Sequence, residues 1–202
     1  MSDILVAGLG NPGEQYRLSR HNAGRLLFTE APDLCHLDDF SWRRDLTAQL
    51  SYGRCADTSF TVILPETYMN LSGQSVAKAM KKEKSANLIV VHDDLALTLG
   101  QFKISLNRGA GGHNGVQSII DALGHKNFIR FRLGINRPAK AGLLSRTFRQ
   151  LIGTGRGRDF VLASFRPEEK EQLLALRPIV WQAVSLIGAE GIQAAMNKFN
   201  RN

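Results

Sequence analysis

Cysteines, prolines and long apolar runs are scarce in this chain of 202 residues. No apolar run approaches the roughly 20 residues that cross a bilayer, and the first residues lack the basic start and apolar length of a signal peptide. We therefore expect a cytoplasmic protein with no membrane partner. Cys35 and Cys55 lack the close spacing of metal ligands, so we expect reduced thiols of minor structural importance. The six prolines are scattered and no linker-like tract occurs, which predicts one domain over residues 1–202.

Acidic residues are almost missing from residues 95–158. This stretch holds eleven lysines and arginines against one acid, Asp121, while the rest of the chain is close to neutral and the net charge is +8. Such a local excess of positive charge favours a polyanionic partner. Nucleic acid is favoured over a membrane, because no amphipathic helix rich in Trp, Phe and Lys accompanies the basic stretch.

Apolar runs typical of strands alternate with segments of helical spacing. The expected strands are 4–9, 60–64, 88–91, 101–106 and 128–135, and the expected helices are 22–31, 72–80, 114–123, 167–188 and 189–199. This alternation predicts an α/β fold, a single α/β/α globule with a mixed, largely parallel twisted sheet. In such sheets, the residues that bind ligands or catalyse reactions lie at the carboxyl ends of the strands. The unusual polar residues follow predicted strands, in segments 10–22, 65–74 and 92–94.

The glycine motif Gly8–Gly13 fits the G-x-G-x-x-G pattern of dinucleotide-binding folds. The fit is poor, because Pro12 and Gly13 form a turn where the helix should begin. The acid expected about 20 residues later should end a second strand, but Glu30 lies in a helical stretch. A nucleotide-dependent oxidoreductase is therefore the weaker hypothesis.

Histidine, carboxylate and amide side chains gather in four short motifs: Ser19–Asn22, Tyr68–Asn70, His92–Asp94 and Gly111–Gly115. A histidine can take a proton from water, a carboxylate can orient it, and asparagines can donate hydrogen bonds to a carbonyl oxygen that gains charge. These parts suit hydrolysis of an activated acyl bond. A serine nucleophile is less favoured because no G-x-S-x-G elbow occurs. A metal site from the histidines and Asp93 lacks the close spacing of strong metal motifs, so we expect no metal.

In this order, the motifs resemble those of the bacterial-type peptidyl-tRNA hydrolase family, and the resemblance covers nearly the whole chain. The matching stretches are Gly8–Gly13 with Tyr16, Ser19–Asn22 with Gly24, Pro65–Gly73, His92–Leu95, Gly111–Gly115, Arg132–Ile135, and Phe160–Leu162 with Phe165. The resemblance implies hydrolysis of the ester between a peptide and its tRNA, an α/β/α fold, no cofactor, and a monomer. The implied partner is the acceptor stem and 3′ end of peptidyl-tRNA.

The resemblance also implies a role for individual residues. His21 is the expected general base, Asp93 orients it, and Asn11 distinguishes blocked from free aminoacyl groups. Around the ester, Asn70 and Asn114 bind the substrate and Met69 forms an apolar wall, while Tyr16 and Tyr68 line the site for the tRNA 3′ end. Phosphates are expected to contact Lys103, Arg108 and Arg132, which supplies affinity without reading base identity.

Two of the departures from the family pattern concern the residues expected to contact tRNA. Ser105 and Asn107 stand where many members carry basic residues, and Arg108 is the expected substitute. Residues 138–158 form a basic segment about a dozen residues longer than in most relatives, for which we expect a lid that contacts tRNA phosphate. Deletion of residues 142–155 tests this lid, and an unchanged salt dependence of affinity would contradict it. Two alternatives to the enzyme are a non-catalytic RNA-binding relative and a purely structural module.

Overall fold

The computed structural model describes residues 4–30, 35–55, 57–83, 87–137 and 155–200. One seven-stranded sheet has the order β2-β3-β4-β1-β5-β7-β6. Its strands are β1 (Ile4–Gly8), β2 (Ser41–Arg43), β3 (Ala48–Cys55), β4 (Thr58–Pro65), β5 (Asn87–Thr98), β6 (Phe102–Leu106) and β7 (Ile129–Asn136). The four central strands β4, β1, β5 and β7 are parallel, while β2, β3 and β6 pair antiparallel at the two edges. The predicted mixed α/β sheet is confirmed.

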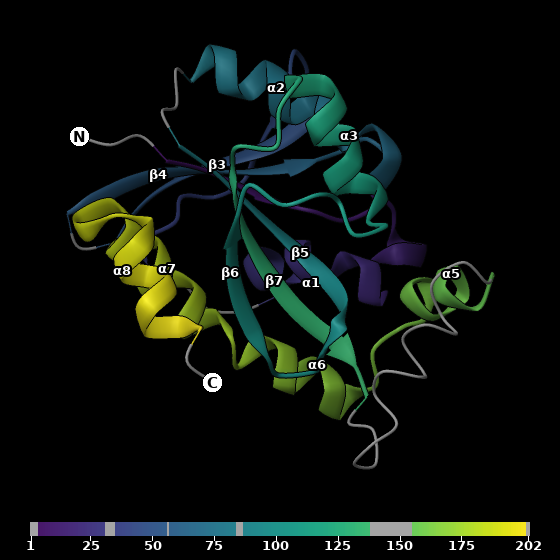
Figure 1. Cartoon of the computed structure of the whole chain (residues 1–202). Coiled ribbons are helices and arrows are strands. Elements are labelled where there is room, and N and C mark those ends of the chain that lie inside the picture. The colour runs from purple at the N-terminus through teal and green to yellow at the C-terminus, as the bar shows by residue number, and fades with distance from the viewer. Residues whose placement is uncertain (1–3, 31–34, 56, 84–86, 138–154, 201–202) are drawn as a thin grey trace.

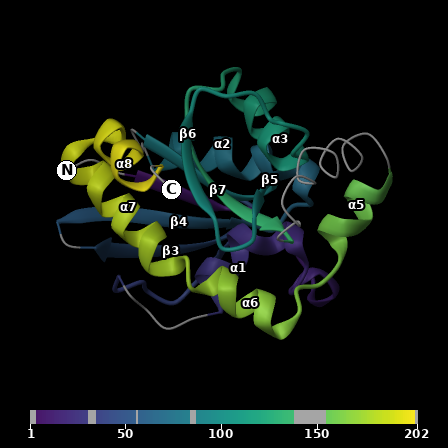
Figure 2. The ribbon, with the colours of Figure 1, turned by 60° about the horizontal axis from the view of Figure 1, so that its bottom comes forward.

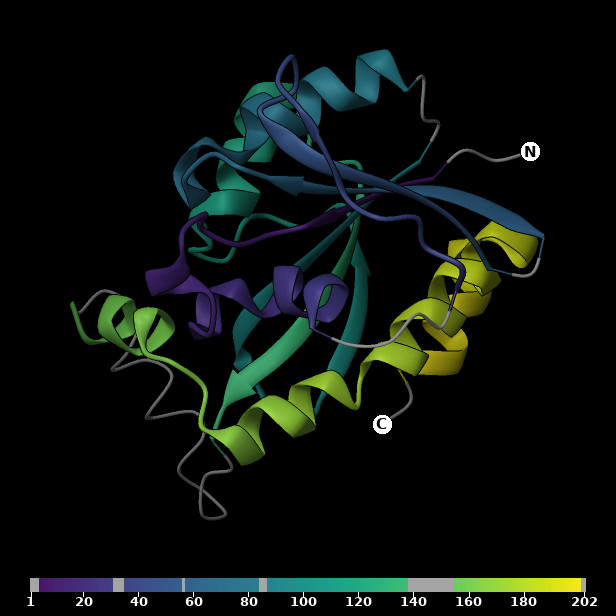
Figure 3. The same cartoon turned by 180° about the vertical axis from the view of Figure 1, so that it is seen from behind.

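Helices cover both faces of the sheet (Figures 1 and 3). One face packs against α2 (Ser72–Lys82) and α3 (Asn114–Leu123), and the other against α1 (Ala23–Thr29), α6 (Pro167–Leu174), α7 (Arg177–Glu190) and α8 (Ile192–Phe199). The central strands are apolar on both faces because each face is buried; Leu5 and Val6 of β1 point into different cores, and both are fully buried. Figure 2 shows α5 (Gly155–Leu162) beside the carboxyl ends of β5 and β7.

The C-terminal helices differ from the single helix predicted over 167–188. The chain breaks between α6 and α7, because Pro178 has no N–H and its ring would collide with the carbonyl of residue 174 in a continuous helix. By length and composition alone, Pro167–Glu190 could cross a membrane. Val180, Trp181 and Val184 are instead buried in the core beneath the sheet, which accounts for the apolar composition.

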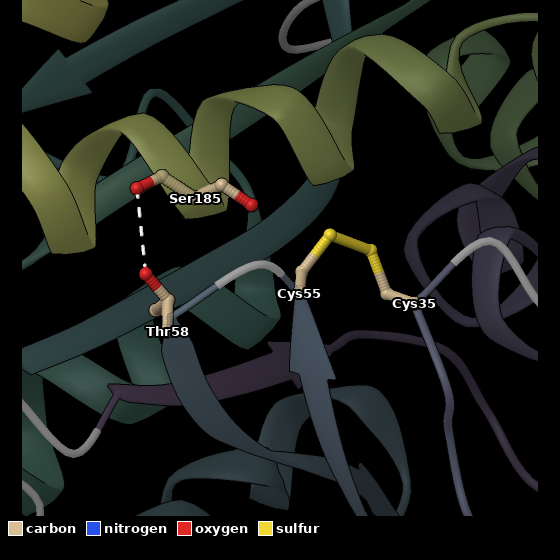
Figure 4. Close-up of a disulfide and its surroundings, with 4 residues drawn as sticks. All are labelled: Cys35, Cys55, Thr58 and Ser185. Atoms are coloured by element: carbon tan, nitrogen blue, oxygen red, sulfur yellow. Dashed lines mark hydrogen bonds between the residues drawn. A yellow bond between two sulfur atoms is a disulfide. The ribbon is translucent and has the colours of Figure 1, made fainter.

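Cys35 and Cys55 form a disulfide, so the expectation of reduced thiols was wrong (Figure 4). The two cysteines are 20 residues apart in sequence. The loop after Cys35 runs beside β3, where the N–H of Asp38 donates to the carbonyl of Tyr52 at 2.8 Å. This pairing brings the end of β3 back to Cys35. Close by, the Thr58 hydroxyl donates to the Ser185 carbonyl of α7 at 3.5 Å.

The predicted basic lid falls mostly outside the described part of the chain. Residues 138–154 are not described, and the segment 142–155 proposed for deletion lies almost entirely within them. The last residues of the lid, 155–158, begin α5. Two further strands, β2 and β3, had not been predicted.

Candidate active site

The polar motifs converge at the carboxyl ends of the central parallel strands. His21 lies in a short 3-10 helix, η2 (Arg20–Asn22), between β1 and α1. Asp93 belongs to β5 itself, which continues to Thr98 with a register shift after Asp94, so the segment 92–94 does not follow the strand as predicted. Gly24 allows α1 to lie against β5, because a Cβ there would overlap the Val91 carbonyl. This close approach brings His21 to Asp93.

A single carboxylate oxygen joins two histidines that come from different parts of the fold. Asp93 Oδ1 lies 2.8 Å from His21 Nδ1 and 2.9 Å from His113 Nε2. All three residues are buried, and the rings of His21 and His113 are 4.7 Å apart between centroids. The predicted contact between His21 and Asp93, 72 residues apart, is present.

The backbone of α3 fixes the tautomer of His113. His113 is the N-cap of this helix, and its Nδ1 accepts hydrogen bonds from the N–H groups of Gly115 (3.1 Å) and Val116 (3.3 Å). The ring proton of neutral His113 must therefore sit on Nε2, which donates it to Asp93. Asp93 has no proton to offer, so His21 also donates from Nδ1. The lone pair of neutral His21 is then on Nε2.

The electrostatics of the buried group favour an ionised carboxylate. Burial acts to raise the pKa of Asp93, but the charges and hydrogen bonds of His21 and His113 outweigh it and hold the pKa far below its usual value. Burial likewise acts to lower the pKa of His21, but the charge and hydrogen bond of Asp93 together raise it above its usual value. Asp93 therefore stabilises the imidazolium that forms when His21 takes a proton.

Neighbouring His92 has a different role from His21. Its Nδ1 lies 2.7 Å from the Asp93 carbonyl oxygen, so Nδ1 is the donor. Burial, with the charge of His113 adding to it, lowers the pKa of His92 well below its usual value. His92 is therefore neutral at physiological pH and is a poor candidate for the base.

One group of possible metal ligands occurs among the described residues. The ligand atoms of His21, Asp93 and His113 lie within 4.8 Å of one another. His113 fits a metal poorly, because its Nε2 carries a proton and moving that proton to Nδ1 would break two hydrogen bonds to the start of α3. The chemistry of these three residues therefore suits proton transfer better than metal binding. The expected absence of a metal stays a prediction.

Asn11 joins the loops that follow β1 and β4. Its backbone N–H donates to Asn22 Oδ1 at 2.8 Å, its carbonyl accepts from Asn22 Nδ2 at 2.9 Å, and its own Oδ1 accepts from the Met69 N–H at 2.8 Å. The Nδ2 donors of Asn11 have no partner among the described residues. The first α-helix begins only at Ala23, so the glycine motif does not open a dinucleotide-binding helix.

A cavity of about 470 Å³ adjoins this group. Five of the predicted site residues line it: His21, Asp93, Arg108, Asn114 and Arg132. Its far wall comes from α5, through Gly157, Arg158 and Val161. Arg132 donates from Nε to Asp94 Oδ2 at 2.6 Å, whereas Arg108 is exposed.

The remaining predicted residues lie outside the lining of this cavity. Met69 is buried, and its sulfur packs where a Cβ on Gly115 would sit. Asn70 is exposed in the 3-10 helix η3 (Met69–Leu71), which packs against α3, and Tyr68 precedes it with 56% of its surface exposed. Tyr16 is half-buried in η1 (Glu14–Tyr16). Lys103 stands opposite Arg132 in the β6–β7 register, but it does not line the cavity, and its Nζ donates to the Asn200 carbonyl at the end of α8 at 2.8 Å.

Arg20 connects the motif that contains His21 to α5, a role that the sequence had not suggested. Its guanidinium donates to the Ser164 carbonyl at 2.7 Å and pairs with Glu169 at 2.5 Å. The same group stacks on Phe160 of α5, 4.8 Å from the ring centroid. The α5 wall of the cavity is therefore held in place by the residue next to His21. Asn22 and His113 were also missed, although both stood in recognised motifs.

The fold and the site together define an α/β protein with a buried histidine–carboxylate group at the carboxyl edge of a parallel sheet, beside arginines. The family model described as peptidyl-tRNA hydrolase matches residues 5–202. The chain is 39% identical over 199 residues to the peptidyl-tRNA hydrolase of Roseiflexus castenholzii, covering 97% of this chain and 86% of that protein. The chain is also 38% identical over 208 residues to the Symbiobacterium thermophilum protein of the same name, and the match covers 97% of this chain and 98% of that protein. The fold is similar to a crystal structure of peptidyl-tRNA hydrolase from Acinetobacter baumannii, with a TM-score of 0.79 and 29% sequence identity. The match covers 98% of this chain and 94% of that one. The chain belongs to the peptidyl-tRNA hydrolase family.

Proposed function

We propose that this chain hydrolyses the ester bond between tRNA and a peptide or N-blocked aminoacyl group, with His21 as general base. The observation that carries the proposal is the 2.8 Å contact between Asp93 Oδ1 and His21 Nδ1, which leaves His21 Nε2 as the acceptor in a cavity lined by arginines. Proton transfer by a positioned histidine is a common route to hydrolysis near neutral pH.

In the proposed reaction, His21 Nε2 takes a proton from water as the water oxygen attacks the ester carbonyl carbon. The carbonyl oxygen gains negative charge, and Asn114, at the start of α3, is placed to donate a hydrogen bond to it. The bond between the carbonyl carbon and the ribose oxygen then breaks. The ribose oxygen takes the proton back from His21, which yields the free carboxylate and the tRNA hydroxyl.

Asn11 suits the proposed discrimination between blocked and free amino groups. Because its Oδ1 is occupied by the Met69 N–H, only the Nδ2 donors are available to the substrate. A peptide or N-blocked group offers a carbonyl oxygen that accepts from them. A free ammonium group offers only donors, so the same Asn11 would be left without a partner and the substrate would bind less well.

The tRNA would be held by the arginines that line the cavity. Arg108 and Arg132 line the cavity and suit phosphate contacts, whereas Lys103 is engaged by the end of α8 and is the least suited of the three predicted cations. Tyr68, largely exposed, suits stacking on a base of the 3′ end, and we assign the same role to Tyr16. We place this activity in the cytoplasm, in a monomer, on the acceptor stem and 3′ end, without metal or cofactor.

The direct test compares hydrolysis of N-blocked and free aminoacyl-tRNA by the wild type and by His21→Ala. The wild type should cleave only the blocked substrate, and the variant should lose about 10²- to 10⁴-fold in rate. His125→Ala, at an exposed histidine after α3, is the matched control and should retain full activity. Binding of tRNA without cleavage by the wild type would instead support the non-catalytic RNA-binding relative.

A further inference from the structure

The disulfide between Cys35 and Cys55 forms part of the wall of a second pocket (Figure 4). This disulfide pocket has a volume of about 540 Å³, within the range of pockets that bind small molecules. Another wall comes from α7, through Trp181 and Leu186. Thr58, the first residue of β4, also lines the pocket. The candidate active site lies at the carboxyl ends of the parallel strands, so the disulfide pocket lies at the other end of the sheet.

The two cysteines differ in how easily an incoming molecule can reach them. Only 2% of Cys35 is exposed, and it belongs to the apolar core that contains α7. Cys55, the last residue of β3, is half-buried. Exchange of a disulfide requires a thiolate to reach one of its sulfur atoms. Because the disulfide lies in the wall of a pocket, a small thiol can reach Cys55, whereas the thiol of a protein would have to enter the pocket.

The charges at the pocket favour a small molecule that carries a carboxylate. Lys198 lines the pocket and is exposed, with its Nζ 5.4 Å from the centroid of the Phe199 ring. Asp57 also lines the pocket, but its carboxylate pairs with Arg54 at 3.5 Å. The charge of Asp57 is therefore partly offset, and the ammonium group of Lys198 attracts an anion. Cysteine and the short peptides that contain it are small thiols with such a carboxylate.

A disulfide is unusual in the compartment that we propose for this chain. Cytoplasmic thiols are kept reduced, and the disulfides that do occur there are usually transient and serve catalysis or redox sensing. The same compartment supplies small thiols. We propose that the disulfide pocket is a thiolation site, in which a small thiol with a carboxylate exchanges with the disulfide and stays bonded to Cys55. This inference goes beyond the proposed hydrolysis and does not depend on that reaction.

The exchange needs no reagent other than the small thiol. Its thiolate attacks Cys55 Sγ and forms a new S–S bond, while the bond between Cys55 and Cys35 breaks. The electron pair of the broken bond goes to Cys35 Sγ, which takes a proton from water. The sulfur of the small thiol is thus oxidised and that of Cys35 is reduced. A thiol enclosed in an apolar core is inert, so Cys35 reverses the step slowly and the mixed disulfide persists.

Thiolation would open the loop that the disulfide closes. The cysteines are 20 residues apart, and a cross-link of this kind stabilises mainly by restricting the unfolded chain. The backbone hydrogen bond from Asp38 to Tyr52 holds the same loop against β3 without the disulfide. Thiolation should therefore lower the melting temperature and leave the fold intact. The candidate active site does not line the disulfide pocket, so hydrolysis well below that temperature should keep its rate.

The first experiment treats the folded protein with glutathione and follows the mass of the intact chain and of its peptides. One glutathione should be added per chain, on the peptide that contains Cys55, with Cys35 present as a free thiol. Two single variants test the same assignment with glutathione disulfide as the probe. Cys35→Ser should take up one glutathione at Cys55, whereas Cys55→Ser should stay unmodified while folded, because Cys35 is enclosed. A folded wild type that glutathione leaves unmodified would overturn the proposal, and so would equal modification of the two variants.

The second experiment tests whether the pocket itself selects the thiol. Lys198→Met should slow exchange with 3-mercaptopropionate about two- to five-fold, the range of an exposed ion pair, and should leave exchange with neutral 2-mercaptoethanol unchanged. Lys81→Met, an exposed lysine at the end of α2, is the matched control and should change neither rate. Ala189→Trp narrows the pocket at an exposed position and should slow both thiols. Unchanged rates in both pocket variants would place the exchange outside the pocket and overturn the proposal.

The third experiment compares small thiols with a protein dithiol. Thioredoxin should open the disulfide of the folded protein no faster than glutathione does at the same thiol concentration, because the sulfur atoms lie in a pocket wall. Faster opening by thioredoxin would show that the disulfide is recognised by a protein and would overturn the proposal. All three experiments are read by mass or by free thiol content. If the wild type fails to hydrolyse N-blocked aminoacyl-tRNA, the proposed function fails, while these experiments still test the thiolation site.

Discussion

Replacing Asp93 by asparagine would remove one negative charge from the most enclosed part of the site and keep its shape. Only 3% of Asp93 is exposed, and its Oδ1 accepts from both His21 and His113. In the wild type, burial acts to lower the pKa of His21, and the carboxylate more than offsets this. In Asp93→Asn only burial remains, so the pKa of His21 should fall below its usual value.

Two kinetic effects should follow from this change. The acid limb of the pH profile of kcat/KM reports the protonation of His21 in the free enzyme, so it should move to lower pH. The plateau should fall about 10²- to 10⁴-fold, because the imidazolium formed in the transition state loses its counter-charge. The variant would thus be slower but would work over a wider acidic range.

The assay is hydrolysis of N-blocked aminoacyl-tRNA between about pH 5 and pH 9, which brackets the titration of histidine. NMR titration of the His21 ring in the free protein gives the same pKa independently. Asp121→Asn, an exposed carboxylate on α3, is the matched control and should change neither quantity. A lowered plateau with an acid limb that stays in place or moves to higher pH would refute the electrostatic reasoning.

Three further changes test other parts of the structure. Gly24→Ala places a Cβ against the Val91 carbonyl, so it should cost about 1–3 kcal/mol in unfolding free energy and lower kcat by moving His21 from Asp93, as measured by urea denaturation and hydrolysis. Serine at both Cys35 and Cys55 should cost about 3 kcal/mol, as expected for opening a loop of this length, with kcat unchanged because neither residue lines the cavity. The pKa of buried His92 is depressed, so this residue stabilises the fold fully above its unfolded pKa of about 6.5 and that stability is lost as the pH falls below it. His92→Gln should therefore make the free energy of unfolding less dependent on pH in the acid range.

The sequence predicted the central part of the fold because that part is buried on both faces. β1, β4 and the first part of β5 are apolar runs, and such runs have few alternatives to a buried strand. β7 was predicted instead from the alternation of its residues. The hairpin of β2 and β3 lies at an edge and mixes polar and apolar residues, with Trp42 51% exposed, so it lacks this signal. The break before α7 was also missed, although Pro178 marks it.

The order of the motifs along the sequence predicted which residues form the candidate site. It did not predict how those residues lie relative to one another. The contact of His21 with Asp93 depends on how closely α1 approaches β5, which Gly24 permits but spacing alone does not reveal. The alternation along residues 128–135 predicted a strand, yet it did not show that Arg130 would be buried without a partner. The disulfide depends on the pairing of a loop with β3, which leaves no local pattern around Cys35.

His113 makes the start of α3 and the reactive group one cooperative unit. Its ring holds two backbone N–H groups on one side and the carboxylate on the other. Helix ends open at lower free energy than the core of a sheet, so local fraying of this first turn precedes global unfolding. Each such opening releases Asp93 and, through it, the orientation of His21. We therefore expect heating to abolish catalysis by opening this one turn of helix, at a temperature below that at which the sheet itself melts.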